Sequence, residues 1–293
     1  MQNGERLLDL NGVRQWVRVE GAEHATVPLL VLHGGPGGNH FVFERTAGLR
    51  LSEQRTIIYH EQRGCGRSEA PAQPNDYSVP LLVSDLRALL GQLGLTQVDL
   101  LGYSFGGGLA LEYAHAHPRT VRRLVAQAPV LALHEARVVA SQLAGFAAVA
   151  QGAVRAKVER ILTSGELPEL MLEQVWASVD TVTVDHLLFQ SPEWATFNRR
   201  LWQASKLGNT GDMHRALEAQ PPTDTSRHLD KIFTPTLILT GRHDRNVPLA
   251  LLREMAGQLP DARLHIFDHS AHFPDVEETE AYAREVLRFL STS

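Results

Sequence analysis

Apolar residues along most of this chain fall into short runs that are separated by amphipathic stretches. Runs typical of strands buried on both faces occur at 28–32, 55–59, 98–101, 122–127 and 234–240. Residues 262–267 predict a further strand, and the alternating pattern at 13–20 predicts an edge strand. Helical spacing follows at 78–93, 105–117, 249–259 and 276–290. Strands that alternate with helices predict an α/β fold, with a mostly parallel sheet covered by helices on both faces.

The alternation of predicted strands and helices stops after Pro129, where a long stretch without a convincing strand begins. Its helical segments are expected at 136–150, 153–162, 167–179 and 194–207, and Pro221-Pro222 predicts a turn near its end. This stretch interrupts the alternation and is best interpreted as an inserted helical cap. The predicted domains are therefore a core at 1–130, a cap at 131–228 and the rest of the core at 229–293.

Composition narrows the class of protein. The 293 residues carry 28 basic and 33 acidic side chains, a net charge of −5, with no basic stripe, so no nucleic-acid partner is expected. Cys65 is the only cysteine, which excludes an intramolecular disulfide. No signal-peptide pattern and no membrane-spanning apolar run is found. We expect a cytoplasmic protein without a membrane partner; the oligomeric state cannot be predicted.

The most informative stretch is Gly102-Tyr103-Ser104-Phe105-Gly106, at the junction of a predicted strand and a predicted helix. A sharp strand-to-helix turn leaves little room for neighbouring side chains. Glycines at 102 and 106 relieve that crowding, so the central serine can adopt strained geometry with its hydroxyl exposed. Ser104 is the candidate nucleophile.

Two further reactive groups follow later strands. Asp244 follows the strand that ends at Thr240, and His272 follows the strand that ends at Phe267. Since the carboxyl ends of parallel strands meet at one edge, the three side chains are expected to converge. His272 would take the proton of Ser104, and Asp244 would orient the imidazole. The N–H groups of Gly35 and Phe105 are predicted to form an oxyanion hole.

Four other residues compete for these roles. His269 is close to His272 but is expected to be an ordinary loop histidine, and Asp268 shares the loop of the histidine that it would have to orient. His33 is expected to brace the glycine loop, and Cys65 to be structural. His265, His269 and His272 lack the His-Glu-x-x-His spacing of a zinc site, and no phosphate-binding glycine loop is present, so neither a metal nor a cofactor is expected.

Three motifs together resemble the proline iminopeptidase family of the α/β-hydrolase superfamily. They are His33-Gly34-Gly35-Pro36-Gly37, Gln62-Arg63-Gly64-Cys65-Gly66-Arg67-Ser68 and the stretch around Ser104. The resemblance implies a helical cap, a triad of Ser104, Asp244 and His272, and release of an N-terminal residue from short peptides. The family usually has Asp where this chain has Glu61.

By the same resemblance, carboxylates on the cap would hold the free amine of the substrate. Glu193, next to Trp194, is the first candidate, followed by Glu218 and Glu173. The expected partner is a short peptide or another small molecule. Relatives with the same core act on esters, lactones or amides, so a hydrolase of small acyl substrates stays an alternative. A receptor that keeps the fold without turnover is a second alternative.

Overall fold

An eight-stranded sheet forms the centre of the computed structural model, which describes residues 1–73, 75–132, 135–208, 211–220 and 225–291. The strand order is β1-β2-β4-β3-β5-β6-β7-β8. The pairs β1–β2 and β2–β4 are antiparallel, and all other neighbours are parallel. The strands are β1 (Gly4–Leu10), β2 (Val13–Glu20), β3 (Leu29–Leu32), β4 (Ile57–His60), β5 (Val98–Tyr103), β6 (Val121–Gln127), β7 (Thr236–Gly241) and β8 (Ala262–Phe267).

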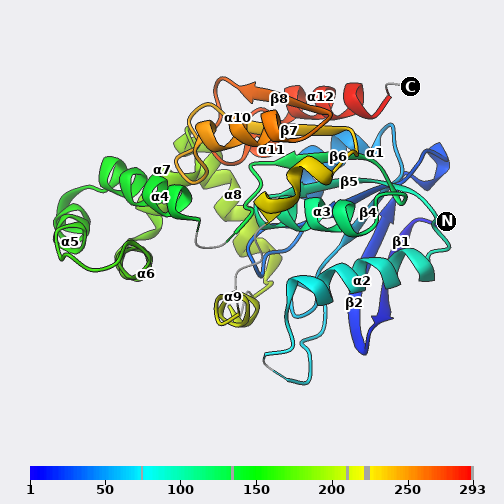
Figure 1. Cartoon of the computed structure of the whole chain (residues 1–293), viewed down its shortest axis with the longest axis horizontal. Helices are drawn as coiled ribbons and strands as arrows, with labels where there is room; N and C mark the ends of the chain where they lie inside the picture. The colour runs from blue at the N-terminus through cyan, green and yellow to red at the C-terminus, as the bar shows by residue number, and fades with distance from the viewer. Residues whose placement is uncertain (74, 133–134, 209–210, 221–224, 292–293) are drawn as a thin grey trace.

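Helices cover both faces of this sheet, as Figure 1 shows. The α-helices of the core are α1 (Ala47–Ser52), α2 (Val79–Gln92), α3 (Phe105–Ala116), α10 (Leu249–Gln258), α11 (Pro274–Glu277) and α12 (Thr279–Ser291). Those between β6 and β7 are α4 (Ala136–Val149), α5 (Gly152–Leu162), α6 (Pro168–Ser178), α7 (Thr181–Leu188), α8 (Pro192–Ser205) and α9 (Asp212–Glu218). Short 3-10 turns are η1 (Ala22–His24), η2 (Phe43–Arg45) and η3 (Thr225–Lys231).

The buried strands divide their side chains between two apolar cores. In β3, Leu30 and Leu32 pack into the core beneath α2, α3 and α10, whereas Leu29 and Val31 pack into the core beneath α1 and α12. All four side chains are buried because successive residues of a strand point to opposite faces and both faces are covered. The continuous apolar pattern of the sequence therefore has a direct physical cause.

Two expectations about the elements are corrected. The segment 13–20 is not an edge strand, because β1, which the sequence pattern did not predict, pairs along its outer side. Helices α7 and α9 were also not predicted; they have 8 and 7 residues, which is too short for a clear helical repeat.

The stretch between β6 and β7 is helical, and its described residues contain no strand. We call residues 131–228 the helical insertion. Figure 1 shows α4, α5 and α6 extending to the left, away from the sheet. The Pro221-Pro222 turn lies outside the described residues. No helix in the described ranges is long and apolar enough to cross a membrane.

Candidate active site

Ser104 occupies a sharp turn between β5 and α3. Its backbone has φ 55° and ψ −122°, outside the ordinary strand and helix regions. A non-glycine residue with such a positive φ stores strain on the order of 1–3 kcal/mol, which the surrounding structure has to hold. The main chain is held by bonds from Ser104 N to Gln127 O (2.8 Å) and from Val130 N to Ser104 O (3.1 Å).

The glycines on either side permit this turn by close backbone approach. A Cβ atom at Gly102 would lie 2.1 Å from the carbonyl oxygen of Gly106, and one at Gly106 would lie 2.3 Å from Leu32 O. Both distances are far inside van der Waals contact, so the crowding expected from the sequence is confirmed. A Cβ atom at Gly34 would lie 3.1 Å from Ser104 Cβ, so the glycine loop after β3 packs directly against the serine.

His272 and Asp244 form a buried hydrogen-bonded pair. Nδ1 of His272 lies 2.9 Å from Asp244 Oδ2, and the other carboxylate oxygen accepts the N–H groups of Asn246 (2.7 Å) and Val247 (3.0 Å). Because the carboxylate accepts, Nδ1 carries the hydrogen and Nε2 keeps its lone pair. The Nδ2 amide of Asn246 lies 3.4 Å from Nε2.

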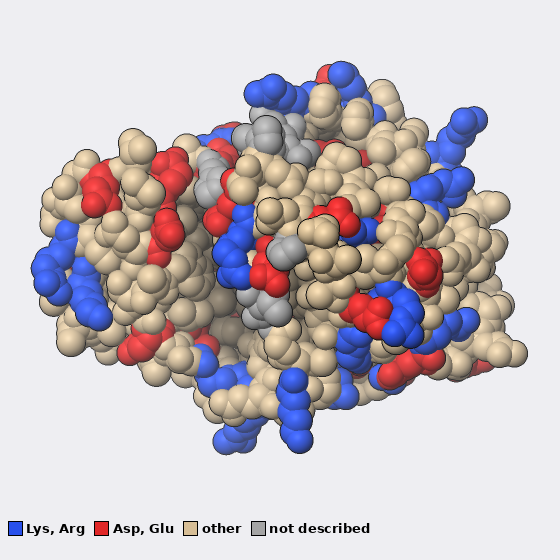
Figure 2. Space-filling model, turned by 90° about the horizontal axis from the view of Figure 1, so that it is seen from below, with Lys and Arg blue, Asp and Glu red and all other residues tan. Residues whose placement is uncertain are grey.

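Ser104 and His272 line one cavity of about 680 Å³. In this structure no described residue makes a hydrogen bond with the Ser104 hydroxyl. The cavity wall combines the loops at the carboxyl ends of the strands with α4, α6, α8 and α9 of the helical insertion. Figure 2 shows the surface hollowed between the lobe of α5 and α6 at the left and the rest of the molecule.

Two backbone N–H groups near Ser104 are without a partner among the described residues. Phe105 is the first residue of α3, so its N–H has no intrahelical acceptor. Gly35 has φ 125° in the loop that Gly38 N closes onto Gly34 O at 3.1 Å. Two free donors beside a serine at a helix N-terminus are suited to bind an oxyanion.

The family model described as "alpha/beta hydrolase fold" matches residues 27–279. The chain belongs to the alpha/beta hydrolase fold family. The predicted fold class and the prediction of a hydrolase are thereby confirmed.

Among related sequences, this alpha/beta hydrolase is similar to the proline iminopeptidase of Levilactobacillus brevis, with 29% identity over 98% of this chain and 96% of that protein. The sequence resemblance to proline iminopeptidases is confirmed over nearly the whole chain. The fold is shared with the proline iminopeptidase-related protein of Thermus thermophilus (TM-score 0.81, 23% identity, 99% and 98% of the two chains). It is also shared with an enol-lactonase of Burkholderia xenovorans (TM-score 0.72, 21% identity, 98% and 100% of the two chains).

The residues that compete with Ser104, Asp244 and His272 lie elsewhere in this alpha/beta hydrolase. His269 and Asp268 are exposed and do not line the cavity; Asp268 instead accepts a hydrogen bond from Arg242 Nε at 2.7 Å. Cys65 is buried, and its burial raises the pKa of the thiol, which disfavours the reactive thiolate. These positions give the three residues no access to the Ser104 hydroxyl.

The glycine loop is braced from beneath by buried side chains. The ring of His33 bonds Gly34 O through Nδ1 (2.9 Å) and accepts the N–H of Gln62 at Nε2 (3.1 Å). Glu61, which replaces the family's aspartate, accepts the N–H of His40 (3.1 Å) and bonds the guanidinium of Arg67 at Nε (3.0 Å). The longer acid therefore ties the loop after β3 to the loop after β4.

A histidine buried beneath this loop makes the free energy of unfolding depend on pH in the acid range. His60 is fully buried, donates from Nε2 to Gln15 Oε1 (2.7 Å) and has an unpartnered Nδ1. Desolvation, aided by His33, lowers the pKa of His60 to about 3. The unfolded chain takes up the proton below about pH 6.5, whereas the folded chain does so only near pH 3. His60 therefore contributes stability that is complete above pH 6.5 and falls as the pH drops towards 3.

We expect the variant His60→Gln to flatten the pH dependence of unfolding. Between pH 5.5 and 4, its free energy of unfolding should fall less steeply than that of the parent chain, by up to about 1.4 kcal/mol per pH unit. Urea unfolding at several pH values measures this slope. The exposed His269→Gln is the control, and equal slopes for the two variants would contradict the assignment.

The sequence-based choice of substrate-binding residues on the helical insertion is corrected. Glu193 and Trp194 do not line the cavity. Glu193 is exposed in the first turn of α8, where a negative charge stabilises the helix N-terminus, and Trp194 packs edge-to-face on Phe197 with ring centroids 5.5 Å apart. Helix α8 faces the cavity with later residues, Asn198 and Trp202.

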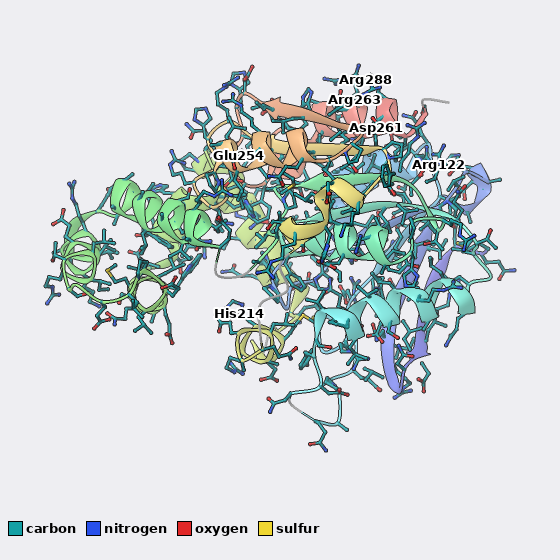
Figure 3. All side chains as sticks on the ribbon, viewed as in Figure 1. Arg122, His214, Glu254, Asp261, Arg263 and Arg288 are labelled. Carbon is teal, nitrogen blue, oxygen red and sulfur yellow. The ribbon has the colours of Figure 1, made fainter. Side chains whose placement is uncertain are left out.

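The runner-up carboxylates do reach the cavity: Glu173 lines it from α6 and Glu218 from α9. Glu169, which was not predicted, also lines it from α6. Glu218 is paired with His214, with Oε1 2.9 Å from Nε2; His214 on α9 is labelled in Figure 3. Glu169 and Glu173 are exposed and carry no ion pair within the described part of the chain.

Several polar residues of the cavity were not predicted from the sequence, among them Asn246 and Asp275. Asn246 lies two residues after Asp244, and Asp275 three residues after His272. Their short spacing from Asp244 and His272 is the signal that could have found them. Across the described residues, no cluster of histidine, cysteine, aspartate and glutamate suited to a metal ion is found.

The helical insertion is tied to the loop that carries His272. The main-chain N–H of His272 donates to Leu188 O (3.0 Å). The carboxylate of Glu277 accepts the N–H groups of Gln190 (2.9 Å) and Ser191 (2.8 Å) at Oε1 and that of Ala271 (2.7 Å) at Oε2. The junction of α7 and α8 and the histidine loop therefore share one anchor.

Proposed function

We propose that this chain is a serine hydrolase that releases the N-terminal residue of a small peptide through an acyl-enzyme. Ser104 is the nucleophile, His272 the general base and acid, and Asp244 the carboxylate that orients His272. The helical insertion acts as a cap over this site. The observation that carries the proposal is the buried Asp244–His272 pair at 2.9 Å, which shares one cavity with a hydroxyl held in a strained turn.

In the first half of the reaction, the Ser104 hydroxyl replaces the Asn246 amide as the hydrogen-bond donor to His272 Nε2. The serine oxygen then attacks the carbonyl carbon while its proton passes to Nε2. The N–H groups of Gly35 and Phe105 stabilise the oxyanion, each by about 3–4 kcal/mol. Breaking of the C–N bond, with return of the proton to the leaving amine, gives the acyl-enzyme.

In the second half, a water molecule attacks the ester carbonyl. His272 takes the proton of the water and returns it to the Ser104 oxygen as the C–O bond breaks. The released acid is the N-terminal residue, and the enzyme is restored without a cofactor.

The charge of the cavity supports a substrate with a free amine. Glu169, Glu173, Glu218 and Asp275 line it, and the arginine on its wall is Arg215, which is paired with Asp212. A wall with this excess of carboxylates attracts cationic groups. The similarity to proline iminopeptidases points to the same substrate class.

A panel of chromogenic substrates tests this function. We expect turnover of proline 4-nitroanilide, with a loss of more than about tenfold in kcat/KM when the ring nitrogen is acetylated, because the acetyl group removes the positive charge. Aryl esters of neutral acids serve as the comparison. Hydrolysis of the esters alone would overturn the peptidase function and favour the second candidate.

The second candidate is an esterase, lactonase or amidase that acts on small neutral acyl groups. The apolar part of the cavity wall, with Val42, Phe43 and Leu172, favours it, as does the fold shared with an enol-lactonase. Both candidates use the same triad chemistry. They differ in whether the substrate carries a charge.

A further inference from the structure

One acidic side chain of the cavity has no part in the mechanism above. Asp275 follows His272 by three residues, in α11, and its side chain is only 3% exposed. It nevertheless lines the cavity that holds Ser104. A carboxyl group in such a position is costly, because burial penalises its ionised form.

The hydrogen bonds of Asp275 satisfy one carboxyl oxygen and leave the other free. Oδ1 accepts from Gln127 Nε2 at 2.7 Å, and the same amide donates to His272 O at 3.3 Å. No other described residue donates to Oδ2. This oxygen is not among the described polar atoms that are both unpaired and sealed from solvent, so it keeps contact with the cavity. A nearly buried acceptor without a donor is thus turned to the space where substrate would bind.

No lysine or arginine within the described chain forms an ion pair with Asp275. The pKa of its carboxyl is raised to about 6, chiefly by desolvation, whereas the Gln127 amide, the main-chain N–H of Asp275 itself and the charge of His272 act in the opposite direction. The carboxyl therefore ionises between about pH 5 and pH 7. Its charged form needs a partner, and the free oxygen is where a partner would sit.

We propose that Asp275 binds the charged amine of the substrate's N-terminal residue through Oδ2, and so is a specificity-determining residue on the floor of the cavity. This inference rests on the proposed function. It differs from the amine-binding carboxylates on the helical insertion that the sequence resemblance implied.

Solvent exposure distinguishes Asp275 from the other acids of the cavity. Glu169 and Glu173 are exposed, so water screens their attraction for a cation. Glu218 already pairs with His214. Asp275 is shielded from water, unpaired at one oxygen and joined through Gln127 to the residue that carries the general base.

The geometry of the substrate supports the same choice. The amine of an N-terminal residue is attached to the carbon next to the scissile carbonyl. A carboxylate that holds this amine must therefore lie near the nucleophile and not at the rim. Asp275 lines the same cavity as Ser104 and His272, and the Gln127 amide joins its carboxylate to the main-chain oxygen of His272.

The test compares two matched substrates. Proline 4-nitroanilide carries the charged ring nitrogen, and cyclopentanecarboxylic acid 4-nitroanilide has the same shape without it. The ratio of their kcat/KM values reports recognition of the charge, because both reactions use the same triad. In Asp275→Asn we expect this ratio to fall by about tenfold to a hundredfold, the range for a hydrogen bond to a charged group.

The parent chain provides a second readout that needs no variant. Titratable groups surround Asp275 on every side: His272, Glu277, Tyr103 and Tyr282 next to it, and Glu169, Glu173, Glu218, His214 and Arg215 elsewhere on the cavity wall. Both reactions depend on the ionisation of His272, so its effect on kcat/KM cancels in the ratio. From pH 5 to 7 the ratio should rise about tenfold, as the ionised fraction of a group with a pKa of about 6 does while the amine stays charged. In Asp275→Asn the ratio should be flat.

Each other outcome overturns the inference. An unchanged ratio in Asp275→Asn, with a fall in Glu169→Gln or Glu173→Gln instead, would place amine recognition on α6 and leave the proposed function intact. An equal loss for both substrates would mean that Asp275 has a structural role. If neither anilide is hydrolysed while neutral esters are, the proposed function fails together with the inference. Thermal unfolding of Asp275→Asn verifies that the variant is folded.

Discussion

Ser104→Ala should abolish hydrolysis while leaving the fold intact. The substitution removes only the hydroxyl group that attacks the substrate carbonyl in the proposed mechanism. Without that hydroxyl no acyl-enzyme can form. We expect kcat to fall by at least about a thousandfold, as it does when the nucleophile of a triad is removed. Alanine has no group that could replace the serine oxygen, and it keeps the backbone φ of 55°, so stability should change little.

Steady-state kinetics on the best substrate of the panel, together with labelling by an organophosphorus probe, measure this effect. The control is Ser178→Ala, because the Ser178 hydroxyl donates to Gln174 O on α6 and does not line the cavity. The parent chain and the control should both be labelled and the Ser104 variant should not. Turnover or labelling that survives in Ser104→Ala would refute the proposed triad.

Asp85→Asn should produce the largest loss of stability among the substitutions considered. The guanidinium of Arg63 is completely buried and bonds both oxygens of Asp85, from Nε at 2.7 Å and from Nη2 at 2.8 Å. Gln15 Nε2 adds a bond to Oδ2 at 2.7 Å. Removing the negative charge leaves the buried cation with one long ion pair, from Nη1 to the exposed carboxylate of Asp76 (3.5 Å), at an expected cost of about 3–5 kcal/mol in the free energy of unfolding.

Urea unfolding measures this loss, and an exposed pair provides the control. Arg155 and Glu159 form an ion pair (2.8 Å) on the surface of α5, with side chains 63% and 58% exposed. Glu159→Gln should therefore cost less than about 0.5 kcal/mol. The double variant Arg63→Met/Asp85→Leu should be more stable than Asp85→Asn, since it leaves no charge buried. A cost for Asp85→Asn similar to that of Glu159→Gln would contradict the argument.

Much of the core could be predicted from the sequence, because its signals are local. The buried strand β3 is a continuous apolar run, β5 is an apolar run with one aspartate in it, and the turn at Ser104 is marked by glycines whose close contacts explain them. The outer strand β1 was missed because its exposed, charged sequence buries little apolar surface. Its position depends on pairing with β2, which composition does not reveal.

The substrate side of the cavity was less predictable. Glu193 and Glu173 are both exposed acids on helices of the insertion, and only the packing of α6 and α8 decides which one faces the cavity. Asp275 was missed for a related reason. A carboxylate close to a histidine is common in sequences, and its burial against Gln127 depends on contact between segments far apart in the chain.

The anchor at Glu277 has a consequence for how molecules enter and leave. Swinging the α7–α8 junction outwards would break its bonds to Glu277 and pull on the backbone of His272. An entrance that opened on that flank would displace His272, the proposed proton acceptor, at each turnover. We therefore expect substrate to enter and product to leave at the opposite rim of the cavity, between α6 and α9. Motion of these two helices would leave the His272 imidazole in place.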